Sequence, residues 1–190
     1  MDQKLTLALR SYYPVSKPFT EAVLRSVSAL TLPKNQHLHE APKVADYMYF
    51  LVSGFAVSYT FIDGEKHVET FRSADEFILY PSSFCHRKPS LEYVMLTRKS
   101  EVLCFSHEDA LRLLHDYPEG SLVFANIVGS LYEESQARLR DIHLMGAEER
   151  YRQLLNRYRD IEQSVSQDTI ASYLGITPQS LSRIKRRNRG

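Results

Sequence analysis

The segment QDTIASYLGITPQSLSRIKR, residues 167–186, decides how the C-terminal part of this chain folds. Its apolar residues Ile170, Ala171 and Leu174 recur at helical spacing and would lie on one face of a short helix. Gly175 follows, and glycine adopts the left-handed backbone conformation at a helix end without steric cost. The segment therefore predicts a short helix that ends in a tight turn.

A second helix is expected directly after this turn. Thr177 can cap it, and Pro178 suits its first position, where no intrahelical N–H is needed. Leu181 and Ile184 are three residues apart and would pack the second helix on the first. This is the helix-turn-helix pattern, whose second helix enters the major groove of DNA. The alternative is an ordinary helical hairpin at the edge of a domain.

Positive charge gathers on the second helix and just beyond it. Five basic residues and no acidic residue follow Thr177 in the sequence: Arg183, Lys185, Arg186, Arg187 and Arg189. From Ala147 onward the chain has nine Lys/Arg and five Asp/Glu, a net charge of +4, whereas the whole chain has only +1. A solvated basic tail is the alternative, but the position on the helix favours contact with nucleic-acid phosphates.

The composition is that of a globular protein. The 190 residues are enough for one large domain, or one domain and a small module, and 43% of them are hydrophobic. The two cysteines, Cys85 and Cys104, have no spacing typical of a metal site or a disulfide framework. Neither a signal peptide nor a run of ~20 apolar residues is found. We therefore expect a reduced, cytoplasmic protein without a membrane span.

The middle of the chain has the pattern of short strands. Residues 32–105 contain runs of four to eight residues rich in Val, Tyr, Phe and Thr, bounded by turn residues. Asp63-Gly64 is the strongest hairpin signal, with a strand over 55–62 before it and one over 67–71 after it. Many short antiparallel strands predict a sandwich or a jelly roll.

A long helix is expected after the strands, at about residues 119–143. Its core-facing positions recur at spacings of three and four, as in a coiled-coil interface. The expected interface residues, with one serine among them, are Phe124, Val128, Leu131, Ser135, Leu139 and Ile142. The alternative is a helix that packs only on the strands of its own chain. Met145-Gly146-Ala147 breaks the helix and marks a domain boundary.

This order of parts resembles the Crp/Fnr family of bacterial transcription regulators. The resemblance is carried by Tyr49–Gly54, Phe77-Ile78, residues 101–118 and residues 166–186. It implies an α+β fold with an antiparallel β jelly-roll barrel over residues 1–118. A long dimerisation helix and hinge over 119–146 and a small helix-turn-helix domain over 147–190 would follow.

The resemblance also implies the partners. A homodimer would bind double-stranded DNA at a two-fold operator, next to RNA polymerase. Gln179 and Arg183 match the positions at which the family reads base edges. The full set of residues expected to contact DNA is Thr177, Gln179, Ser180, Arg183, Lys185, Arg186 and Arg187.

The sequence departs from the family at its effector pocket. Family members that bind a cyclic nucleotide have a Gly-Glu pair and an Arg-Ser-Ala that holds the phosphate. These positions fall here on Leu79-Tyr80 and on Ser90-Leu91-Glu92, and Glu92 would repel a phosphate. We therefore expect a small-molecule effector other than a standard cyclic nucleotide, or none. The residues left to line a pocket are Tyr80, Arg87, Ser90, Ser135 and Gln136.

A cyclic-nucleotide regulator with altered phosphate contacts is the alternative, in which Arg87 replaces the missing arginine. The family also usually continues into a β-hairpin wing after the second helix of the motif. Because the sequence ends at Gly190, the contacts of that wing are expected to be missing or to come from elsewhere.

An enzyme is the least supported class. Jelly rolls can hold metals, but the histidines of the strand region lack the spacing of a cupin ligand set: His37, His39, His67 and His86. The Cys85-His86 pair suggests haem or metal only by analogy with one branch of the family, and a surface loop explains it better. No nucleophile and base are paired in the sequence. We expect no catalytic activity, no bound metal and no cofactor.

Overall fold

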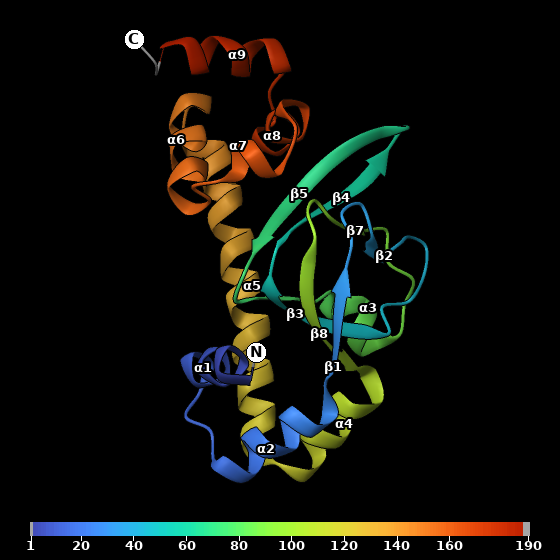
Figure 1. Cartoon of the computed structure of the whole chain (residues 1–190). Coiled ribbons are helices and arrows are strands. Elements are labelled where there is room, and N and C mark those ends of the chain that lie inside the picture. The colour runs from blue at the N-terminus through green and yellow to red at the C-terminus, as the bar shows by residue number, and fades with distance from the viewer. Residues whose placement is uncertain (1, 188–190) are drawn as a thin grey trace.

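The computed structural model describes residues 2–187. Figure 1 shows a helical N-terminal part, a central β region and a helical C-terminal part, with one long helix running along the molecule. The first two helices are α1 (Asp2–Tyr12) and α2 (Lys17–Ser26). The strands are β1 (Ser28–Leu32), β2 (His37–His39), β3 (Tyr47–Ser53), β4 (Phe55–Ile62), β5 (Glu65–Ser73), β6 (Glu76–Ile78), β7 (Tyr93–Leu96) and β8 (Ser100–Ser106).

The strands of the described residues form two four-stranded antiparallel sheets, in the orders β1-β8-β3-β6 and β2-β7-β4-β5. The expected mixture of helices and antiparallel strands is confirmed. The expected jelly-roll barrel is not confirmed, because the described strands form two separate sheets that do not close on each other. Apolar side chains from both sheets fill the space between them, among them Leu51 of β3 and Leu96 of β7, which are fully buried.

The hairpin at Asp63-Gly64 joins β4 to β5 as the sequence predicts. Both turn residues have positive φ angles, 51° and 83°, which Asp and Gly tolerate better than branched residues do. The short helix α3 (Pro81–His86) was not expected. It lies between β6 and β7, at the point where the sequence pattern indicated only a loop.

The long helix α5 (Pro118–Leu144) follows the short helix α4 (His107–Asp116) and is 27 residues long. Its first half packs on the N-terminal helices and the first sheet. Val123 and Ile127 are buried there, and Phe124, Val128 and Leu131 pack around the same core. The first half of α5 is therefore held by its own chain.

The C-terminal helices are α6 (Ala147–Arg157), α7 (Ile161–Ser164), α8 (Gln167–Leu174) and α9 (Pro178–Arg187). They share one apolar core with the outer side of β4 and β5. In this core Tyr158 packs edge-on against Phe55, with 5.5 Å between ring centroids, and its hydroxyl donates to the Phe71 carbonyl at 2.9 Å. The helical C-terminal part and the second sheet are thus joined by burial as well as by hydrogen bonds.

Helices α8 and α9 are joined as the sequence predicts. Gly175 ends α8 with a φ of +66°, and Ile170, Leu174 and Leu181 are almost fully buried. The Thr177 hydroxyl accepts a hydrogen bond from the Ser180 amide at 3.2 Å, which caps α9. The local geometry that the segment specifies is present, whereas its role in binding DNA remains a prediction.

Gly54, between β3 and β4, allows a test of how tightly this turn packs against the start of β8. It has a φ of +117°, and an added Cβ would lie 2.0 Å from the Ser100 hydroxyl oxygen, which is buried. Gly54→Ala should therefore lower the free energy of unfolding by about 3 kcal/mol, since backbone strain and a steric clash add. Urea unfolding measures the change.

The matched control is Gly64→Ala in the hairpin turn. Gly64 also has a positive φ, but nothing lies within 4 Å of an added Cβ. Only backbone strain remains, so the loss should be about 1 kcal/mol. Equal losses in the two variants would show that the contact with Ser100 does not matter.

Candidate functional site

A cavity of about 260 Å³ lies inside the β region, between the second sheet, the segment after β6 and helix α5. Its lining combines apolar residues with residues that carry hydroxyl or charged groups. The apolar residues are Ala56, Ile78, Leu79, Pro81, Val94 and Leu131. The polar residues are Ser58, Glu69, Thr70, Arg72, Tyr80 and Ser135. A mostly apolar lining with a few polar groups suits a small organic molecule.

The hydroxyl groups of the cavity are ordered by one another. Ser58 and Thr70, opposite each other on β4 and β5, are 3.0 Å apart at their oxygens. Burial raises the pKa of Tyr80, so its phenol stays neutral and able to donate a hydrogen bond. Ser58 acts on this pKa in the opposite direction, but less strongly than burial. The hydroxyl groups of the cavity thus offer neutral donors and acceptors.

Arg72 is the cation of this cavity, and it already has a partner. Its guanidinium donates to Glu134 of α5 at 2.9 Å and to the Phe71 carbonyl at 2.9 Å. Its side chain is 12% exposed. The same Glu134 oxygen lies 2.9 Å from the guanidinium of Arg157 on α6. One carboxylate therefore connects the cavity to the C-terminal helices.

The sequence placed five residues in an effector pocket, and the structure brings two of them, Tyr80 and Ser135, to the cavity. Arg87 lies elsewhere, because it pairs with the Asp46 carboxylate and donates to the Ala45 carbonyl at 2.8 Å. Ser90 is buried, and its hydroxyl donates to Glu92. Gln136 is not among the lining residues.

Two important lining residues, Glu69 and Arg72, were missed by the sequence analysis. Thr70 and Arg72 are two apart on β5, so a strand pattern would place both on one face. That signal was available for Arg72. Glu69 had no such signal, because its position depends on an irregularity in the pairing of β5 with β4.

A wider cavity continues from this one along α5 toward the C-terminal helices. It measures about 520 Å³ and shares Glu69, Thr70, Arg72, Leu131 and Ser135 with the first. Beyond these residues it is lined by Glu134, Ala137, Arg138, Leu139, Asp141, Ile142, Arg157 and Tyr173. The inner cavity is therefore open to solvent at the junction between the β region and the C-terminal helices.

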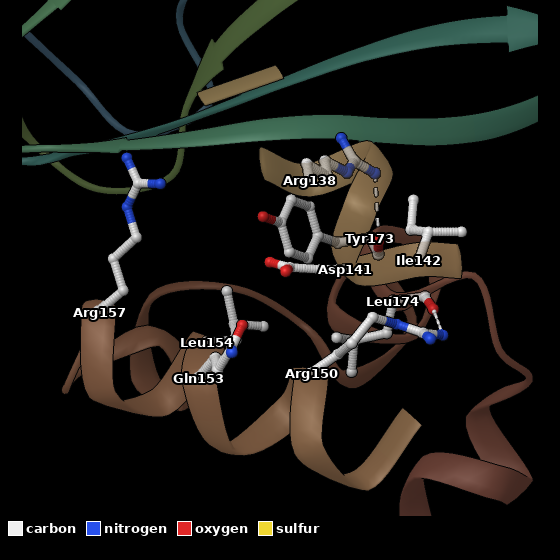
Figure 2. Close-up of a pocket in the computed structure, with 9 residues that line it drawn as sticks. All are labelled: Arg138, Asp141, Ile142, Arg150, Gln153, Leu154, Arg157, Tyr173 and Leu174. Atoms are coloured by element: carbon white, nitrogen blue, oxygen red, sulfur yellow. Dashed lines mark hydrogen bonds between the residues drawn. The ribbon is translucent and has the colours of Figure 1, made fainter. Parts of the chain in front are cut away.

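Figure 2 shows a smaller pocket of about 120 Å³ at this junction, between α5, α6 and α8. Arg138 donates to the carbonyls of Val68 and Tyr173, at 3.0 and 3.1 Å. Arg150 donates to the carbonyls of Met145 and Leu174, at 2.6 and 2.8 Å. The arginine heads point to different sides in Figure 2, so they do not form one anion site. They join backbone segments of neighbouring elements instead.

The residues expected to contact DNA lie on and around α9. Gln179, Arg183, Arg186 and Arg187 are exposed. Lys185 lies 2.5 Å from Glu162, with 14% of its side chain exposed, so it is engaged within the chain. Thr177 and Ser180 cap the helix. Arg189 of the basic cluster lies outside the described residues.

The exposed apolar face of α5 differs from the expected seam. Leu139 and Ile142 are 48% and 43% exposed, in agreement with an interface. Phe124, Val128 and Leu131 instead pack against the core of their own chain. Their place on the exposed face is taken by residues one or two positions away in the sequence: Leu122, Ala125, Gly129 and Tyr132. Tertiary packing, which the repeat itself does not reveal, decides which stripe of the helix is covered.

Within the part of the chain that the structure describes, the remaining titratable groups do not cluster as metal ligands. Among residues 2–187, no group of three or more His, Cys, Asp or Glu side chains is placed to hold a metal ion. His39 is buried beside Tyr80, its Nε2 has no hydrogen-bond partner, and burial lowers its pKa. No helix in the described part of the chain has the length and apolar character needed to cross a membrane.

Comparison with known proteins agrees with this architecture. Residues 29–117 match the family model of the cyclic nucleotide-binding domain. No curated protein matches the chain. The matched residues run from strand β1 through helix α4.

Solved structures of bacterial regulators have the same fold over most of the chain. The regulator CLP of Xanthomonas campestris, described as responsive to c-di-GMP, superposes with a TM-score of 0.71 at 14% identity, covering 92% of each chain. FixK2 of Bradyrhizobium japonicum gives 0.70 at 17% identity, covering 85% of this chain and 83% of its own. The catabolite activator protein of Thermus thermophilus gives 0.61 at 15% identity, covering 95% and 85%.

Glu134→Gln is the most direct test of the junction between the cavity and the C-terminal helices. Glu134→Gln would leave the guanidinium of Arg72, which is 12% exposed, without a charged partner. The free energy of unfolding should fall by about 2 kcal/mol, somewhat less than for a fully buried pair, because Glu134 is 23% exposed. Chemical denaturation of the variant and the parent measures this loss.

Glu133→Gln, one residue earlier on an exposed side of α5, is the matched control. It should change the stability by less than about 0.5 kcal/mol. If both variants unfold at the same denaturant concentration as the parent, the bond between Arg72 and Glu134 does not stabilise the junction.

Proposed function

We propose that this chain is a sequence-specific DNA-binding transcription regulator that reads DNA with α9 and senses a small molecule in the cavity of its β region. The observation that carries the proposal is the exposed basic face of α9, capped and packed on α8, at the far end of a cyclic nucleotide-binding domain. Basic side chains on one side of a short helix suit binding in a major groove lined by phosphates. Such a regulator would act in the cytoplasm beside RNA polymerase, without catalysis.

The proposed assembly is a homodimer joined along α5. Leu122, Ala125, Gly129, Tyr132 and Leu139 are exposed at spacings of three, four, three and seven residues. A stripe with this repeat packs against a two-fold copy of itself, and the small residues in its middle allow close approach. This stripe takes the place of Phe124, Val128 and Leu131 in the interface that the sequence indicated. Two copies would present two α9 helices to a two-fold operator.

The proposed effector is not a standard cyclic nucleotide. Ser90 stands at the position where the family has its phosphate-binding arginine. The Ser90 hydroxyl donates a hydrogen bond to the carboxylate of Glu92. The alternative, in which Arg87 supplies the phosphate contact, is weakened because Arg87 is paired with Asp46 and held at the Ala45 carbonyl. The cavity itself has an arginine, Arg72, that is already neutralised by Glu134.

Arg183→Ala tests the reading of DNA. Arg183 is exposed on α9 and would contact a base edge, so its loss should lower discrimination at one base position by about 1–3 kcal/mol. Arg186→Ala should instead weaken binding to all sequences alike and flatten the dependence on salt. Titrations of an operator selected from random duplexes, and of a scrambled duplex, at several salt concentrations separate the two effects. A preference that survives Arg183→Ala unchanged would contradict the role of α9.

Leu139→Asp tests the dimer. Leu139 is 48% exposed in the single chain, so a charge there leaves the core intact but is buried when two copies meet. The variant should be a folded monomer by sedimentation, while the parent is a dimer at micromolar concentration. Leu7→Asp, at a 60% exposed position of α1, should remain dimeric. A monomeric parent would rule out the assembly.

A further inference from the structure

The pairing of β5 with β4 contains a bulge at Glu69. Ser58 is opposite Thr70, whereas the next residue, Tyr59, is opposite Val68, so Glu69 is the extra residue of β5. In a regular strand Glu69 and Thr70 would point to opposite faces of the sheet. Here both line the inner cavity, and Val68 and Phe71 point to the other side, into the core shared with the C-terminal helices. The bulge therefore turns an additional side chain, a carboxylate, into the cavity.

The carboxylate of Glu69 has no matching cation. Within residues 2–187 no Lys, Arg or His nitrogen forms an ion pair with it, and Arg72, which lines the same cavity, is held by Glu134 and the Phe71 carbonyl. Arg138 acts on it only from a distance and is bonded to two carbonyl groups. Burial raises the pKa of Glu69, and this effect outweighs a hydrogen bond from Thr60 and the charge of Arg138, which lower it, while the charge of Glu92 adds to the rise. A partly buried carboxylate without a counter-charge is costly, so the site favours a group that supplies one.

The rest of the lining limits what that group is attached to. Beside the hydroxyls of Ser58, Thr70 and Ser135, the lining includes the apolar side chains of Leu79, Val94 and Leu131. A volume of about 260 Å³ accepts a compact body and one polar head. An anionic head would meet Glu69 and find Arg72 already neutralised.

We propose that the inner cavity binds a compact organic amine, with its ammonium group at the Glu69 carboxylate and its apolar body against Leu79 and Leu131. The inference rests on the proposed regulator function only in naming this amine as the effector. The amine would lie beside Arg72, whose partner Glu134 also holds Arg157 of α6. Its binding thus acts on the carboxylate that joins the cavity to the C-terminal helices.

Calorimetry on the full chain tests the charge preference with three probes of one shape: tyramine, neutral 4-hydroxyphenylacetamide and anionic 4-hydroxyphenylacetate. Cyclic AMP is the fourth probe. At about pH 8, where the amine is still charged, tyramine should bind at least about tenfold more tightly than the carboxylate. Cyclic AMP should not bind. Failure of tyramine to bind at millimolar concentration, or equal binding of the anion, overturns the proposal.

Glu69→Gln and Glu65→Gln locate the site. Glu69→Gln keeps the side-chain shape and should lower the affinity for tyramine by about tenfold or more. Glu65 is on the same strand but exposed beside the hairpin turn, so Glu65→Gln should leave the affinity for tyramine unchanged. The melting temperature of each variant without ligand shows that both are folded. Tyramine binding that is equal in Glu69→Gln and the parent overturns the proposal.

DNA binding is measured separately, so the two proposals fail separately. A chain that binds tyramine through Glu69 but has no preferred duplex would contradict the regulator function and leave the amine site standing. A chain that selects a duplex but binds none of the probes would contradict the amine site alone.

Discussion

Strand β5 is the element on which the rest of the structure depends, because both of its faces are used. Its outer face buries Val68 and Phe71 against the C-terminal helices, and its inner face lines the cavity with Thr70 and Arg72. As the last strand of its sheet, β5 also has free backbone groups. Ser172 of α8 satisfies two of them, accepting from the Val68 amide at 3.0 Å and donating to the Lys66 carbonyl at 3.1 Å. A shift of β5 would therefore change both the cavity and the packing of the C-terminal helices.

The junction around β5 combines apolar burial with arginine side chains that join different elements. Arg138 of α5 binds one carbonyl on β5 and one on α8, and its guanidinium stacks on the Tyr173 ring at 4.3 Å. Arg98, after β7, pairs with Asp160, before α7, at 2.6 Å. Hydrogen bonds of this kind are directional, so they fix the orientation of the C-terminal helices more strictly than burial alone. A ligand that moves one such side chain has a physical route to α9.

The candidate cavity was predicted in part. Tyr80 and Ser135 lie in it because strand β6 and helix α5 are placed as the resemblance implied. Arg87 was a reasonable substitute for a missing arginine, but a short helix that no pattern indicated carries it to Asp46. Glu69 was beyond the reach of period-two reasoning, because a bulge reverses the face that a residue occupies.

The sequence by itself determined the local features, since residues close along the chain specify them. These are the turn at Gly175 between α8 and α9, the Asp63-Gly64 hairpin and the cap at Thr177, whose hydroxyl oxygen accepts from the Ser180 amide at 3.2 Å. Only the tertiary structure decided which stripe of α5 is covered, that the sheets remain open and that the cavity holds a carboxylate, Glu69, without an ion pair among the described residues. Those features depend on residues far apart in sequence, such as Arg72 and Glu134, whose meeting no local spacing encodes.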